Sequence, residues 1–220
     1  SSAQYEFGGA TTIASAGNIT ASATDPDIDS DSAVTLTGNL VLSDGAFNLN
    51  AGGGNIGITG TVTSAGTDES ISLTSTGSGE ITLGGAVTSG SITLSGAGAV
   101  NLGGNLVTTD TDSGAIAITG PVTLDANITI DADANATNTV TFNSTATIDS
   151  DATARTLTID TAGGAIALQG AVGETNALSA LTINADGTGA IEVANIGDSS
   201  VGVTGATAIG NGDTTTLTLD

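Results

Sequence analysis

The sequence lacks several residue types on which most catalytic and binding sites depend. It contains no cysteine, histidine, methionine or tryptophan, and Arg155 is its only basic residue. Without cysteine the chain forms no disulfide and carries no thiol chemistry. Aromatic residues make up 2% of the chain. The core therefore has to be built from aliphatic side chains, which suit thin, regular layers better than a bulky globular centre.

The charge of the chain is strongly one-sided. Its 23 acidic residues and one basic residue give a formal net charge of −22. Nucleic acids and anionic membrane surfaces both attract proteins through cationic side chains, so the composition excludes both as partners. An acidic surface instead favours solubility and the binding of divalent cations.

The sequence has neither a long apolar run nor a leader segment. No stretch of 18 consecutive apolar residues occurs, so we expect no membrane-spanning helix. The chain begins Ser1-Ser2-Ala3 without methionine and without a basic, apolar leader. We therefore expect a processed chain or an excised fragment.

This composition contains few of the residue types that catalyse reactions in enzymes. Nucleophilic catalysis by serine or cysteine needs a base such as histidine, which the chain lacks. Acid and base catalysis would depend on carboxylates alone, and glycoside hydrolysis needs two of them across a cleft. The sequence therefore predicts a protein that is not an enzyme.

One motif recurs along the chain and predicts the architecture. It reads apolar, any, apolar, any, glycine, any, apolar, and a shorter apolar-any-apolar motif alternates with it. The full copies are Val34–Leu40, Ile56–Val62, Ile81–Val87, Val100–Leu106, Ile116–Val122 and Ile166–Val172. Period-two alternation places aliphatic residues on one face of a strand and Thr, Ser and Asn on the other. A short strand cannot bury its apolar face alone, whereas stacked coils bury a continuous column.

These repeats predict an all-β parallel β-helix, or β-solenoid, with coils of about 20 residues and about nine or ten coils. Ile56, Ile81, Val100, Ile116 and Ile166 are expected to form one inward column. An antiparallel β-sandwich is the alternative, because it also has short strands at regular spacing. We divide the chain into an N-terminal strand segment with an acidic loop, residues 1–32, and solenoid repeats over residues 33–220.

The densest run of carboxylates lies near the N-terminus. Asp25, Asp27, Asp29 and Asp31 alternate with other residues, and oxygen-rich loops of this kind suit Ca²⁺. The sequence therefore predicts a calcium site at these four residues. The alternative is a solvated turn, because aspartate is a common turn residue. Smaller acidic pairs occur at 110/112, 131/133 and 149/151.

The run GAIAITGPVTLDANITIDADANATNTVTFNSTATIDSDATARTLTID, residues 114–160, resembles the repeats of very large bacterial surface and secreted exoproteins. The chain is similar in composition and rhythm to the filamentous-haemagglutinin-like adhesins over residues 30–220. The resemblance implies a right-handed β-helix shaft, export across the cell envelope, and a role in attachment, matrix or filament formation. The secretion domain of that family is not present in this sequence.

We therefore expect a non-catalytic structural segment of an extracellular or cell-surface fibre, adhesin or filament. The alternative function is a calcium-stabilised binding module for a glycan of the cell surface or matrix, or another surface ligand. Neither terminal sequence reads as a solenoid cap. The partner is therefore expected to be the protein itself, either through head-to-tail assembly or through continuation in a longer chain.

Overall fold

The computed structural model shows an all-β chain in which every paired strand is parallel to its partners. It describes residues 3–66, 68–112, 114–197, 201–210, 212 and 214–219. The strands stack as a β-solenoid of about 9 turns with about 24 residues per turn. The predicted solenoid is confirmed and the antiparallel sandwich is wrong, although the turns are longer than the expected 20 residues. At about 4.8 Å per turn the rod is roughly 43 Å long.

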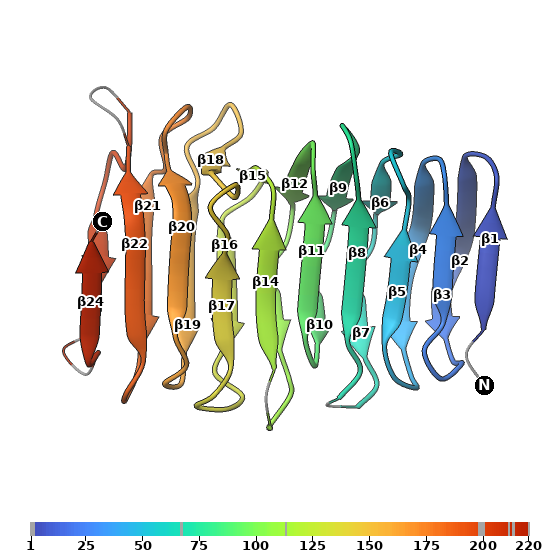
Figure 1. The fold of residues 1–220 in the computed structure, drawn as a ribbon, viewed down its shortest axis with the longest axis horizontal. Helices are drawn as coiled ribbons and strands as arrows, with labels where there is room; N and C mark the ends of the chain where they lie inside the picture. The colour runs from blue at the N-terminus through green and yellow to red at the C-terminus, as the bar shows by residue number, and fades with distance from the viewer. Residues whose placement is uncertain are drawn as a thin grey trace.

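Each turn contributes strands to three sheets, which we call faces A, B and C. Figure 1 shows face A, whose strands follow one another in chain order along the long axis from β1 at the N-terminal end to β24 at the other. Face A consists of β1 (Gln4–Phe7), β3 (Asp27–Ser30), β5 (Phe47–Asn50), β8 (Ile71–Ser75), β11 (Ile92–Gly96), β14 (Ala115–Thr119), β17 (Thr139–Phe142), the first half of β20 (Ile166–Val172) and of β22 (Ala190–Ile196), and β24 (Thr216–Leu219).

Faces B and C complete each turn. Face B consists of the first halves of β2 (Thr11–Ala21) and β4 (Val34–Leu42), then β6 (Ile56–Ile58), β9 (Glu80–Leu83), β12 (Ala99–Leu102), β15 (Val122–Leu124), β18 (Ile148–Ser150) and the ends of β20 and β22. Face C consists of the second halves of β2 and β4, then β7 (Val62–Ser64), β10 (Val87–Ser89), β13 (Leu106–Thr108), β16 (Ile128–Ala132), β19 (Thr156–Thr161), β21 (Ala180–Ala185) and β23 (Thr207–Ile209).

The alternating sequence explains why these segments form strands with one buried side. In β8 and β16 the burial pattern alternates residue by residue, with Ile71, Leu73, Ile128 and Ile130 buried. Threonine and serine occupy the outward positions, where branched and hydroxylated side chains suit a pleated surface. Stacked turns thus fill the interior of the rod with aliphatic columns, and the core is continuous from Ile28 to Val193.

The expected single column of five isoleucine and valine residues is wrong. Ile56, Ile81 and Val100 do stack on one another on face B. Ile116 instead stacks on Ile92 on face A, and Ile166 also lies on face A. Val122, the last residue of the fifth motif copy, is the residue that continues the column from Val100.

The reason is that the motif contains a corner of the solenoid. In the early copies its glycine turns the chain from face B to face C, and Gly85 lies directly over Gly60. From Ile116 onward the same motif turns the chain from face A to face B, with Gly120 at that corner over Gly96. One sequence motif therefore serves two different corners, and its copies fall on different faces.

The first 32 residues belong to the same stack as the rest of the chain. β1 pairs with β3, and β2 pairs with β4. Residue 32 lies between β3 and β4, inside the second turn. The outer limits of the two expected segments, residues 1 and 220, lie outside the described residues.

Candidate functional site

The acidic segment predicted to bind calcium spans face A of the second turn, from the loop before β3 to the corner after it. Asp25 is in the loop that leads from face C to face A and has a positive φ of 51°. Asp27 and Asp29 are in β3 on face A, and Asp31 follows at the next corner. Asp27 and Asp29 point outward, because Ile28 and Ser30 between and after them are buried.

The carboxylates of this segment accept hydrogen bonds from the turns on either side. The side chain of Asn48 donates to Oδ1 of Asp27 at 2.7 Å. Gln4 donates through Nε2 to Oδ2 of Asp29 at 3.1 Å. Oδ1 of Asp25 accepts the backbone N–H of Ala46 at 3.0 Å. These contacts link three consecutive turns.

The geometry of β3 separates the four carboxylates. An extended strand advances about 3.3 Å per residue, so alternate side chains stand about 7 Å apart. No three carboxylates of the described residues converge into a group that could hold a metal ion. In this geometry the four aspartates are arranged as a row that cross-links turns, and calcium binding by them stays a prediction.

A second acidic cluster was not identified from the sequence as a unit. Asp131 pairs in register with Asp160, and Asp160 with Asn184, so residues from successive turns meet on face C. Partial burial, followed by the charges of Asp160, Asp131 and Asp186, raises the pKa of Asp133. The sequence spacing links only Asp131 with Asp133, and the turn length is needed to bring in the others.

Asn184 holds this second cluster together. Its Nδ2 donates to Oδ1 of Asp160 at 2.8 Å and to Oδ1 of Asp186 at 3.1 Å. An amide donor between two carboxylates offsets part of their mutual repulsion, because each carboxylate accepts a charge-assisted hydrogen bond. The Oδ1 atom of Asn184 is buried and accepts no hydrogen bond from the residues that the structure describes.

The one basic side chain of the sequence makes an ion pair on a corner between faces B and C. Arg155 donates through Nε to Oδ1 of Asp151 at 3.0 Å and through Nη2 to Oδ2 at 2.6 Å. The hydrogen bonds from Arg155 lower the pKa of Asp151. Partial burial, and then the charge of Asp151, raises the pKa of Asp125 in the preceding turn. Arg155 therefore reduces repulsion between two stacked carboxylates.

The three acidic pairs at 110/112, 131/133 and 149/151 also accept hydrogen bonds from the backbone. Oδ1 of Asp149 accepts the backbone N–H groups of Thr175 and Asn176 at 2.8 and 2.9 Å. Asp110 accepts the N–H of Asp112 at 2.7 Å, and Asp131 that of Asp133 at 3.0 Å. The bonds of Asp110 and Asp131 to the residue two positions on are the ordinary role of aspartate in turns. Those of Asp149 join two successive turns of the solenoid.

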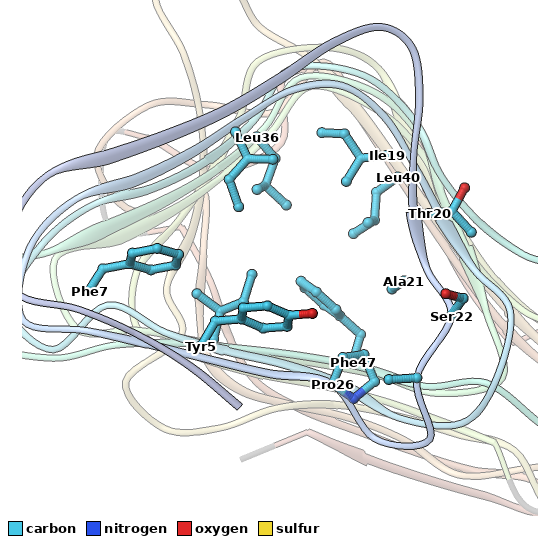
Figure 2. Close-up of a pocket in the computed structure, with 13 residues that line it drawn as sticks. Tyr5, Phe7, Ile19, Thr20, Ala21, Ser22, Pro26, Leu36, Leu40 and Phe47 are labelled. Atoms are coloured by element: carbon cyan, nitrogen blue, oxygen red, sulfur yellow. The ribbon is translucent and has the colours of Figure 1, made fainter. Parts of the chain in front are cut away.

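The N-terminal end of the solenoid contains an apolar cavity of about 290 Å³. Figure 2 shows Tyr5 and Phe7 pointing into the interior, across from Leu36 and Ile19. The first turn lies on one side of the cavity, and Ile28, Leu40 and Phe47 of the second and third turns also line it. The cavity is therefore the interior of the rod where the stack of described turns ends.

No helix among the described residues is long and apolar enough to cross a membrane. Comparisons with known protein families, with curated proteins and with solved structures find no match to this chain.

Proposed function

We propose that this chain is a non-catalytic structural segment of an extracellular or cell-surface fibre or adhesin. The observation that carries the proposal is the unbroken parallel stack, in which the same three columns run through all the described turns. Each turn hydrogen-bonds only to its neighbours, so the stack is a shaft whose length is set by the number of turns.

The outer surface of the shaft supports the same role. Its strands present mostly threonine, serine, asparagine and aspartate, and carboxylates such as those of Asp27, Asp29 and Asp149 accept hydrogen bonds from adjacent turns. The side chains whose pKa is shifted, Asp125, Asp133, Asp151 and Arg155, lie at corners of the solenoid. Arg155 and Asp151 form an ion pair, whereas the pKa values of Asp125 and Asp133 are shifted by partial burial and by the charges of neighbouring aspartates. The causes of these shifts are contacts within the stack.

The composition supports a place outside the cell. A surface with a net charge of −22 stays soluble and repels other copies laterally, and a shaft held together without cysteine does not depend on the redox state of its compartment. The resemblance to large exported repeat proteins points in the same direction.

Immunogold electron microscopy of intact cells that produce the protein tests this proposal. Antibodies raised against the folded chain should label thin fibres or a coat outside the cell envelope, and the label should disappear after deletion of the coding sequence. Antibodies pre-absorbed with the purified chain provide the control. Label confined to the cell interior would overturn the proposed function.

A further inference from the structure

Face A carries a continuous area of outer surface without ionisable side chains. Six successive strands of this face, β5, β8, β11, β14, β17 and the first half of β20, lie side by side (Figure 1). Their outward residues run from Asn48 and Asn50 in β5 to Ala167 and Gln169 in β20, and we call this surface the neutral patch. All of these outward residues are serine, threonine, asparagine, glutamine or alanine.

The carboxylates of the same turns are concentrated along one edge of the neutral patch. The corners that lead from face C into these strands contain Asp44, Asp68, Glu69, Asp110, Asp112 and Asp133. The opposite corners, which lead from face A to face B, are residues 51–55, 76–79, 97–98, 120–121 and 143–147. The structure describes all of these positions, and none of them is ionisable. The patch therefore has one acidic edge and one neutral edge.

The neutral patch is the part of the rod surface through which two copies repel least. Face B carries Glu80 and Asp149 on its outer side, and face C carries Asp131 and Asp160. The net charge of −22 repels copies that approach through the acidic edge or through these faces. Depletion of charged residues at the centre of a surface is also the compositional mark of protein interfaces.

We propose that the neutral patch binds the neutral patch of a second copy of this chain. The two sheets then pack face to face with the rods side by side, as sheets with small uncharged side chains do. A small ligand such as a sugar fits the patch less well, because such sites are concave and lined by aromatic side chains. The inference rests on the proposed structural function and names the lateral partner of the shaft.

The acidic edge decides how the two rods are oriented. A two-fold axis along the rods makes them point the same way and places the acidic edge of each copy over the neutral edge of its partner. A two-fold axis along the strands makes the rods antiparallel and places the two acidic edges against each other. Because like charges at short distance repel, the charge distribution favours parallel rods in a symmetric dimer.

The size of the neutral patch sets the strength of the contact. Six strands about 4.8 Å apart, each about five residues long, give an area of roughly 460 Å² per copy. A stable interface buries about 800 Å² per partner, so the contact should be weak. Asp27 and Asp29 at one end of the patch and Glu192 at the other oppose it. Since added salt screens this repulsion, the contact should strengthen as the salt concentration rises.

Sedimentation equilibrium of the purified chain tests the contact. At about 500 mM NaCl we expect a monomer–dimer equilibrium with a dissociation constant on the order of 1 mM, and weaker association at about 20 mM. Thr93→Asp places a carboxylate on an exposed position of β11 within the patch and should weaken association roughly ten-fold or more. Thr63→Asp adds the same charge at an exposed position of β7 on face C and should have little effect.

Chemical cross-linking tests the orientation. Gln169 is exposed at one end of the patch, and Gln169→Cys gives one thiol per copy because the chain has no cysteine. Across sheets about 10 Å apart, parallel rods hold the two thiol positions about 12 Å apart, whereas antiparallel rods hold them about 26 Å apart. A bis-maleimide reagent with a reach between these distances should give covalent dimers. Thr182→Cys, exposed on face C, should not.

Three results would overturn the contact: a monomer at every concentration and salt level, equal association of Thr93→Asp and Thr63→Asp, or no covalent dimer from Gln169→Cys. Circular dichroism of each variant establishes that it has folded. Retention of a monomeric chain on insoluble cellulose, lost in Thr93→Asp, would assign the patch to a glycan instead.

The lateral contact and the proposed function fail separately. A chain that stays monomeric in solution yet labels fibres on cells overturns the lateral contact alone. A chain that forms dimers through the neutral patch but is found only inside cells overturns the proposed function.

Discussion

Gly120 lies directly against the carbonyl oxygen of Gly96 in the turn before it. A Cβ atom on Gly120 would stand 1.9 Å from that oxygen, and the residue has a φ of +96°. Both the close approach and the backbone conformation therefore require glycine at this corner. The contact is between backbones of adjacent turns, so neither can move without disturbing the parallel ladder on both sides of the corner.

Gly120→Ala should reduce the free energy of unfolding by about 2 kcal/mol or more, through strain at a positive φ and the collision with Gly96. Urea denaturation followed by circular dichroism measures the change. Gly53→Ala is the matched control, because a Cβ there meets nothing within 4 Å, and it should change stability by less than about 0.5 kcal/mol. Equal effects of the two substitutions would contradict the corner assignment.

Phe142 is the largest fully buried side chain of the rod and stacks between Ile118 and Leu168. Phe142→Ala should lower the free energy of unfolding by about 3–5 kcal/mol, because it leaves a cavity between turns. Thr141→Ala changes the neighbouring outward residue and should cost less than about 1 kcal/mol. A small loss for Phe142→Ala would mean that adjacent turns collapse into the space.

The acidic cluster on face C should make stability depend on pH. Partial burial and the charges of Asp160, Asp131 and Asp186 raise the pKa of Asp133 above its ordinary value of 3.8. The folded state then binds a proton that the unfolded chain has already lost. The stability that protonated Asp133 contributes is fully present below pH 3.8, its ordinary pKa, and is lost as the pH rises through its raised pKa in the folded state.

Asp133→Asn should therefore stabilise the protein at pH 7, by on the order of 0.5 kcal/mol after allowance for exposure to solvent. The gain should vanish near pH 4. Asp44→Asn removes one charge at an exposed corner and should give a smaller gain at pH 7. The pKa of Asp151 is lowered, so its effect on stability has the opposite sign. Its contribution is present above the ordinary pKa of aspartate and is lost as the pH falls through the lowered one. Thermal melts of each variant and the parent at both pH values provide the comparison.

Calcium binding by Asp25, Asp27, Asp29 and Asp31 is tested by ligand linkage. If the segment binds Ca²⁺ with a dissociation constant of about 1 mM, then about 5 mM calcium should raise Tm by roughly 2–4 °C. Asp27→Ala combined with Asp29→Ala should abolish most of that rise. Asp44→Ala combined with Glu80→Ala removes the same charge elsewhere and should retain it. An unchanged melting curve would leave the segment as a solvated row of aspartates.

The sequence by itself determined that this chain is all-β, and its repeats favoured a solenoid over an antiparallel sandwich. Its strands are short, their aliphatic residues alternate with threonine and serine, and a glycine-containing motif returns at every turn or nearly so. These are local properties, since alternation decides which side of a strand is buried and glycine decides where the chain bends. Neither depends on which turn lies next to which.

Only the tertiary structure decided which residues of different turns meet. Ile56 and Ile116 occupy the same position in two motif copies but lie on faces B and A, because the motif changes corner between Val100 and Ile116. Asp131, Asp160 and Asn184 come together, whereas the neighbours Asp25 and Asp31 are held at opposite ends of β3. The spacing of 16 residues between Val100 and Ile116, shorter than the 19 residues that separate the stacked Ile81 and Val100, indicates the change of corner. The register between coils depends on the lengths of the turns, which are unequal. It is decided by how the backbones of neighbouring turns stack, so it cannot be read from a single repeat.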